Sequence, residues 1–148
     1  MKIIKFEEKY RDDLIFMILE AKNALGRIPG LNQDLLDIKA HYFDNGDMFW
    51  IAIDDNNRVI GSVGYRTNED MTSVTLHRLF VKCSFKHQGI GTNLLKTAES
   101  YIESIGKKTI YLNLGVGDEW FESRAFYTKY GYIEYEPNKM KKTLEGIL

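Results

Sequence analysis

The sequence of 148 residues contains one cysteine, two prolines and no long uninterrupted apolar run. Because Cys83 is the only cysteine, no internal disulfide can form, which excludes a secreted fold held together by disulfides. The apolar stretch at residues 14–19 is far too short to span a bilayer, and acidic residues interrupt the first ten positions. We therefore expect a cytoplasmic protein with neither an export signal nor a membrane anchor.

The sequence also has little net charge. Its 20 lysines and arginines are balanced by 21 aspartates and glutamates, which leaves a net charge of −1 and no general attraction for nucleic acid. Apolar residues make up 44% of the chain, an ordinary globular composition. A chain of this length buries roughly two-thirds of its unfolded surface, so we expect a single domain spanning residues 1–148.

Hydrophobic periodicity predicts the order of helices and strands along the chain. A strand at residues 2–6 is followed by a helix from Asp12 to near Gly26 and by a second helix from Asn32 to Tyr42. The remaining expected elements are strands at 48–53, 59–65 and 72–81, a helix at 89–105, a strand at 109–114, a short helix at 122–130 and strands at 132–135 and 139–144. The strand, helix and strand between residues 79 and 114 predict a parallel pair with a right-handed crossover.

The most informative stretch is residues 78–95, where a strand leads through a basic, glycine-containing turn into a helix. Gly89 and Gly91 allow close approach to the backbone, and Lys86, His87 and Gln88 lie beside them. Helix N-termini present unpaired N–H groups and a partial positive charge. The turn therefore predicts a phosphate or pyrophosphate site, although glycine also serves in plain tight turns.

Two familiar phosphate motifs do not fit this turn. A nucleotide P-loop has lysine and then serine or threonine after its second glycine, whereas Thr92 and Asn93 follow Gly91. A dinucleotide fingerprint has a third glycine or alanine where Leu94 stands. A nicotinamide-dependent enzyme is therefore a distant alternative.

The segment Lys86-His87-Gln88-Gly89-Ile90-Gly91 resembles the acetyl-CoA-binding motif of the GNAT superfamily of N-acetyltransferases, Arg/Gln-x-x-Gly-x-Gly/Ala. The order of expected elements is similar to that family along nearly the whole chain. The resemblance implies an α/β (α+β) fold: a mixed, mostly antiparallel, twisted sheet with a splayed central parallel pair, flanked by about four helices. Lys86 stands where the family has arginine or glutamine, which keeps a cation but loses the planar fork of arginine.

The resemblance also implies acetyl-CoA as cosubstrate and the residues that would bind it. The pantetheine arm would pair with exposed backbone between the splayed strands. The implied cofactor-binding residues are Leu79, Phe80, Val81, Lys86, His87, Gln88, Gly89, Ile90, Gly91, Thr92, Asn113 and Tyr127. Asn113 is a candidate substitute for an asparagine of the family, because Trp120 stands at that asparagine's usual place.

Residues 125–132, Ala-Phe-Tyr-Thr-Lys-Tyr-Gly-Tyr, are similar to a second motif of the family. Its tyrosine commonly protonates the departing CoA sulfur, a role that falls on Tyr127, and a phenol stays protonated at neutral pH. A core tyrosine is the alternative. For the base that deprotonates the amine, the local candidates are His77, Glu119 and Glu122, although a structural histidine and an exposed acidic loop are the ordinary interpretations.

The sequence thus predicts an N-acetyltransferase that moves an acetyl group directly to a primary amine in a ternary complex. The alternative is a non-catalytic domain that binds or senses acyl-CoA. The acceptor amine, a small molecule or a peptide or protein amine, is not identified. No metal site, nucleic acid or membrane partner is expected, and a homodimer through sheet edges or the final strands is conceivable.

Overall fold

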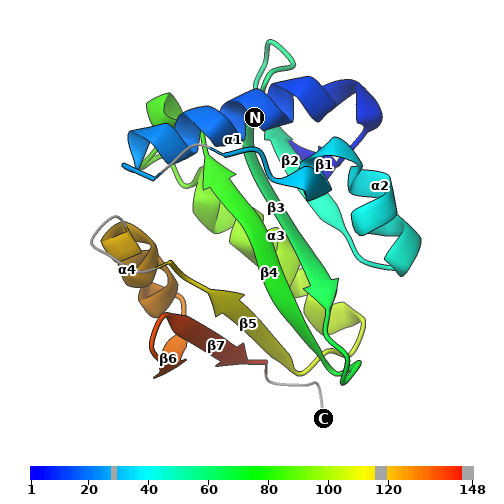
Figure 1. Ribbon diagram of the computed structural model, residues 1–148, viewed down its shortest axis with the longest axis vertical. Helices are drawn as coiled ribbons and strands as arrows, with labels where there is room; N and C mark the ends of the chain where they lie inside the picture. Colours follow the sequence, from blue (N-terminus) through cyan, green and yellow to red (C-terminus); the bar gives the residue numbers. More distant parts are fainter. Residues whose placement is uncertain (28–29, 116–119, 145–148) are drawn as a thin grey trace.

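The structure, a computed structural model, describes residues 1–27, 30–115 and 120–144 (Figure 1). Seven strands in these ranges form one sheet in the spatial order β1-β2-β3-β4-β5-β7-β6. They are β1 (Lys2–Lys5), β2 (Phe49–Ile53), β3 (Val59–Thr67), β4 (Ser73–Val81), β5 (Thr109–Asn113), β6 (Ile133–Glu136) and β7 (Lys139–Thr143). Neighbouring strands are antiparallel except β4 and β5, which are parallel. The predicted mixed sheet with a central parallel pair is confirmed.

Helices cover both faces of the sheet. The α-helices of the described ranges are α1 (Arg11–Ala24), α2 (Ile38–His41), α3 (Ile90–Ser104) and α4 (Phe121–Lys129), and the 3-10 turns are η1 (Glu8–Tyr10), η2 (Gln33–Leu36), η3 (Phe43–Asn45) and η4 (Cys83–Phe85). Among these helices, none combines the length and the apolar character needed to cross a membrane.

The single helix predicted from Asn32 to Tyr42 is wrong. The chain instead forms η2 and then the one-turn helix α2, with Asp37 between them at φ −145°, outside the helical region. The Asp37 carboxylate accepts a hydrogen bond of 3.0 Å from the backbone N–H of Ala40. Asp37 therefore caps a new helix and does not continue the preceding turn.

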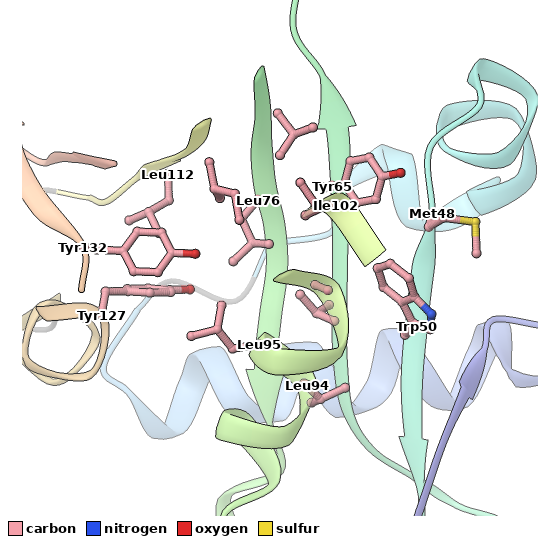
Figure 2. Packing of buried hydrophobic residues seen from close by; sticks show 14 of the residues in the cluster. Met48, Trp50, Tyr65, Leu76, Leu94, Leu95, Ile102, Leu112, Tyr127 and Tyr132 are labelled. Carbon is pink, nitrogen blue, oxygen red and sulfur yellow. The ribbon is translucent and has the colours of Figure 1, made fainter. Parts of the chain in front are cut away.

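The core lies in two layers, one on each face of the sheet. β2 contributes to both, because side chains alternate along a strand: Phe49, Ile51 and Ile53 pack with α1, while Trp50 and Ala52 pack on the side of α3. The second layer also joins α3 to α4, and Figure 2 shows Tyr127 and Tyr132 of this layer with their rings directed toward Leu76 and Leu95. Burying each large apolar side chain contributes roughly 1.5–3 kcal/mol, so these layers hold the sheet between its helices.

β4 and β5 separate soon after they pair. Residues 73–75 of β4 align with residues 109–111 of β5, and β4 then continues to Val81 in register with β3. β5 remains paired with β7 over its whole length. The predicted splay of the parallel pair is confirmed. Beyond residue 75, the edge of β4 that faces β5 has no strand paired with it in the described residues.

Candidate active site

A cleft opens where β4 leaves β5. Its volume is about 710 Å3, and it is bounded by the end of β4, the turn after η4, the first turn of α3, the helix α4 and the end of α1. Ten of the predicted site residues line it: Leu79, Phe80, Val81, Lys86, His87, Gly89, Ile90, Gly91, Thr92 and Tyr127. Gln88, His77 and Asn113 are not among the lining residues, and Asn113 is exposed at the end of β5.

The glycine turn reaches the cleft in a conformation that suits an anion. Gly89 has φ +82° and precedes Ile90, the first residue of α3, while His87 is also left-handed at φ +64°. Gly91 differs from Gly89, because it lies within α3 and a Cβ there would be in van der Waals contact with the cleft lining, 3.4 Å from Cγ2 of Val81. The N-terminus of a fifteen-residue helix thus faces a space that glycine keeps open.

Side chains tie this turn to α4. The ammonium of Lys86 lies 3.0 Å from a carboxylate oxygen of Glu122, and the hydroxyls of Thr92 and Tyr130 lie 2.6 Å apart. Glu122, one of the candidate bases, therefore already forms an ion pair with Lys86. An anion bound at the turn would compete with Glu122 for Lys86.

Tyr127 is a buried side chain at the edge of the cleft. Its ring makes edge contacts with Phe126 and Tyr132, at centroid distances of 5.3 and 5.4 Å. Burial raises the pKa of the Tyr127 phenol above its usual range, although the charge of Arg27 lowers it in part. The phenol consequently stays protonated at neutral pH, as a proton donor to a thiolate must.

Arg27 bridges the two sides of the cleft, a contact that the sequence did not predict. Its guanidinium stacks 3.5 Å from the ring centre of Trp120 and donates a hydrogen bond of 2.9 Å to the hydroxyl of Ser123. The indole in turn covers Gly115, where a Cβ would collide with the ring. Trp120, which departs from the family pattern, therefore holds the end of α1 against the start of α4.

The strand β4 carries a bulge just before the cleft. Ser62 aligns with Phe80 and Gly64 with His77, so that Arg78 and Leu79 together lie opposite the single residue Val63. Arg78 has φ +58°, a left-handed conformation that costs a residue other than glycine on the order of 1–3 kcal/mol. The hydroxyl of Ser62 donates a hydrogen bond of 2.7 Å to the carbonyl of Arg78.

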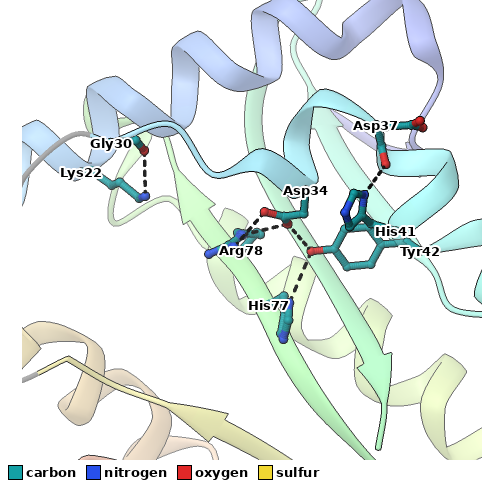
Figure 3. A network of polar contacts seen from close by, with 8 residues as sticks. All are labelled: Lys22, Gly30, Asp34, Asp37, His41, Tyr42, His77 and Arg78. Atoms are coloured by element: carbon teal, nitrogen blue, oxygen red, sulfur yellow. Dashed lines mark hydrogen bonds and ion pairs between the residues drawn. The ribbon is translucent and has the colours of Figure 1, made fainter.

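A network of polar side chains holds the bulge from the side of α2 (Figure 3). Nε and Nη2 of Arg78 donate to the two carboxylate oxygens of Asp34, at 3.1 and 2.9 Å, and the hydroxyl of Tyr42 donates to Asp34 at 2.6 Å. Burial opposes ionisation of Asp34, but the hydrogen bonds from Arg78 and Tyr42 outweigh it and hold the pKa of this carboxyl below its usual range. The sequence drew attention to none of these contacts, because Arg78 and Asp34 are 44 positions apart.

His77 belongs to this network and not to the wall of the cleft. Its Nδ1 lies 3.4 Å from the hydroxyl of Tyr42, and burial and then the charge of Arg78 lower its pKa to about 4. The imidazole is thus neutral at pH 7 but is a weak base. Glu119, the other predicted base, lies outside the described residues.

No group of three or more His, Cys, Asp or Glu side chains among the described residues could hold a metal ion. Cys83 is exposed in η4.

A mixed sheet opened between its two parallel strands, with a glycine turn at the opening, is the architecture that the resemblance to the GNAT superfamily implied. The model of the acetyltransferase (GNAT) family matches residues 14–132 of the sequence. The chain therefore belongs to the GNAT acetyltransferase family, whose cosubstrate is acetyl-CoA.

Relatives agree with this assignment. Probable N-acetyltransferase 14 from Xenopus tropicalis is 29% identical over 103 residues, which cover 70% of this chain and 48% of the relative. The chain thus spans about half the length of that curated relative.

Solved structures show the same fold. A GNAT acetyltransferase from Staphylococcus aureus superposes with a TM-score of 0.85 at 23% identity, covering 97% of this chain and 99% of the other. The PaiA N-acetyltransferase from Thermoplasma acidophilum, crystallised with coenzyme A, has a TM-score of 0.75 at 20% identity, covering 97% and 98% of the two chains.

Proposed function

We propose that this chain binds acetyl-CoA in the cleft beside β4 and transfers the acetyl group directly to a primary amine. One observation carries the proposal: the glycine turn before α3, the unpaired end of β4 and the protonated phenol of Tyr127 all border the same cleft. These are the three features that an extended thioester carrying a diphosphate needs, namely an anion site, a backbone edge and a proton donor.

The diphosphate would bind at the turn. The N–H groups of the first turn of α3 and the cation of Lys86 favour a doubly charged ligand, and the absence of side chains at Gly89 and Gly91 allows it to approach. Glu122 would then give up part of its contact with Lys86.

The pantetheine arm would extend along β4. Leu79, Phe80 and Val81 line the cleft on the edge that β5 leaves open, so backbone groups there are available to an extended ligand that acts as an additional strand. Asn113 remains a predicted contact of this arm, although its exposed position outside the cleft favours backbone contacts instead.

In the chemical step the amine nitrogen would bond to the thioester carbon, and the bond between carbon and sulfur would break. Tyr127 would donate its proton to the leaving thiolate, and N–H groups of β4 would stabilise the negative charge on the carbonyl oxygen. The ammonium form of the amine must lose one proton before it attacks. The nitrogen would lose a second proton as the amide forms, and this proton would return to the Tyr127 phenolate. With its pKa of about 4 and its place outside the cleft lining, His77 is poorly suited to accept the first of these protons directly, which leaves water or Glu119 as the proposed route.

The alternative is an acyl-CoA-binding domain without catalysis. The buried, protonated Tyr127 favours the enzyme, because binding alone does not require a proton donor at the cleft. The proposed acceptor is an amine of a small molecule, a peptide or a protein, and we propose that the chain can assemble as a homodimer.

Two linked measurements test the proposal. Thermal unfolding with acetyl-CoA, CoA or NAD should show stabilisation by the two CoA compounds alone, roughly 2.7 kcal/mol at 100 times the dissociation constant. Release of free thiol from acetyl-CoA should then be followed across a panel of amines, with the variant Tyr127→Phe as the matched control. Stabilisation by NAD alone would overturn CoA binding, and CoA binding without thiol release from any amine would favour the non-catalytic domain.

A further inference from the structure

We infer that Asp34 is a positioning residue for acetyl transfer, because it holds Arg78 in its left-handed conformation and so directs the backbone of Leu79 into the cleft. This inference rests on the function proposed above. Asp34 acts through Arg78 and does not itself contact the substrate.

The conformation of Arg78 needs an explanation from outside its own segment. Positive φ is common for glycine and several-fold enriched for asparagine, aspartate and histidine, whereas arginine has no such preference. A residue in a sparsely populated region persists only where its surroundings determine its conformation. At φ +58°, Arg78 is held at both ends, by Ser62 on its carbonyl and by Asp34 on its guanidinium.

The contact with Asp34 is the more specific of the two restraints. Both carboxylate oxygens are used in a two-point pair with the guanidinium, a geometry that arginine makes and lysine does not. One of these oxygens also accepts the hydrogen bond of Tyr42, so the carboxylate has little capacity left for an acceptor amine. The Asp34 side chain is 14% exposed.

The segment that carries Asp34 is firmly placed. Leu35, Ile38 and Tyr42 are fully buried in the layer between α1 and the sheet, at 1%, 0% and 0% exposure. The ring of Tyr42 also makes an edge contact with Phe49 at a centroid distance of 5.1 Å. The core therefore fixes the position of the Asp34 carboxylate. The carboxylate in turn holds Arg78, and with it the bulge, in place.

The bulge lies immediately before the part of β4 that borders the cleft. Bulges redirect the residues after them, and Leu79, the second bulge residue, is the first residue of β4 that lines the cleft. In the proposed reaction this backbone faces the thioester carbonyl. Loss of the Asp34 contact should leave the diphosphate site intact and misalign the groups that polarise the carbonyl.

The test compares Asp34→Ala with the double variant Asp34→Ala/Arg78→Gly. Glycine adopts positive φ without strain, so the second substitution permits the bulge without the carboxylate. The polarisation of the carbonyl is measured directly as the infrared stretching frequency of [1-13C]acetyl-CoA bound to each protein, and turnover is measured with the most active amine of the panel. Asp44→Ala is the matched control, since it removes an exposed carboxylate that pairs with Lys39 on the same side of the molecule.

Asp34→Ala should lower kcat about tenfold to 100-fold and move the carbonyl frequency toward that of free acetyl-CoA, with the dissociation constant of acetyl-CoA changed by less than about threefold. The added Arg78→Gly should restore most of the frequency shift and of kcat, and Asp44→Ala should behave as the unaltered protein. If Asp34→Ala does not fold, Asp34→Asn keeps the side-chain size while removing the charge, and the same results are expected with smaller amplitude.

An unchanged carbonyl frequency in Asp34→Ala, or a loss that glycine at position 78 does not reverse, would overturn the inference. A change confined to KM for the amine would do the same, because it would place Asp34 in direct contact with the acceptor. Failure of the proposed function is a separate result: the unaltered protein would then bind no acetyl-CoA, or bind it without transferring its acetyl group to any amine.

Discussion

Two regions next to the end of β4 are built in different ways: the turn side, which lines the cleft, and the network side, which holds the bulge just before the cleft. The turn side, residues 86–92, is one continuous segment whose proposed function depends on backbone N–H groups and on the small size of glycine. The network side consists of Asp34, Tyr42, His77 and Arg78, which come from separate elements and bond to one another. The turn side should therefore tolerate changes of side-chain chemistry but not of shape. The network side should respond to the loss of any one partner.

Tyr127 lines the cleft together with the turn, and its replacement should have the largest effect on catalysis. Tyr127→Phe removes the proton donor but retains the buried ring, so kcat should fall by about 100-fold or more while the affinity for acetyl-CoA stays nearly constant. Stopped-flow release of thiol and calorimetric titration measure the two quantities. Tyr111→Phe, in a ring pair with Tyr135 outside the cleft, is the control. Unchanged turnover in Tyr127→Phe would remove this residue from the mechanism.

The network side should make folding stability sensitive to pH through His77. Its pKa of about 4 lies below the ordinary value of 6.5, so the unfolded chain binds a proton more readily than the folded chain between these values. Stability should therefore fall as the pH decreases through this window, by on the order of 2 kcal/mol between pH 7 and pH 5.

Urea unfolding at pH 7 and pH 5 measures this difference. His77→Gln should remove most of the stability difference between pH 7 and pH 5. The control is His41→Gln, which should retain this difference; the ring of His41 contacts the carbonyl of Asp37. Equal pH dependence in all three proteins would mean that His77 is not held neutral by the fold.

The two glycines of the turn side should respond in opposite ways. Gly91→Ala should preserve stability, because alanine favours helices, but its methyl group would narrow the cleft beside Val81 and should weaken CoA binding about tenfold. Gly89→Ala should instead lower stability by about 1 kcal/mol, since φ +82° is unfavourable for alanine and its methyl group meets no neighbour within 4 Å. Thermal unfolding and calorimetric titration separate the two effects. Full CoA affinity in Gly91→Ala would argue against a diphosphate at this turn.

The smallest effect is expected at the ion pair that closes the turn side. Glu122→Gln should release Lys86 for the ligand and raise CoA affinity about twofold to fivefold at low salt. The gain should diminish at high salt, because exposed charges are screened. Glu136→Gln, which alters an exposed pair with Lys139 elsewhere, should leave affinity unchanged at every salt concentration. A loss of affinity in Glu122→Gln would show that Glu122 organises the turn instead of competing with the ligand.

Prediction from the sequence succeeded where the signal was local. The alternation of apolar residues in β2, the crossover through α3 and the glycine-containing turn before α3 are all set by neighbours in the chain. It failed for the second helix, because the capping side chain of Asp37 outweighed the apolar spacing around it. Trp120 illustrates the same limit: its departure from the family motif was visible, but its stacking with Arg27 was not.

The sequence by itself determined the family, the order of the elements and the turn that suits an anion, since each depends on residue types at short spacing. Only the tertiary structure decided that Asp34 reaches Arg78, that His77 does not line the cleft and that Arg27 joins α1 to α4. The contacts of Arg78 with Asp34 and of Arg27 with Ser123 join residues that are 44 and 96 positions apart. The environment of His77 depends on what packs against the two faces of β4. Such contacts are fixed by how the two core layers pack, and no short stretch of sequence contains that information.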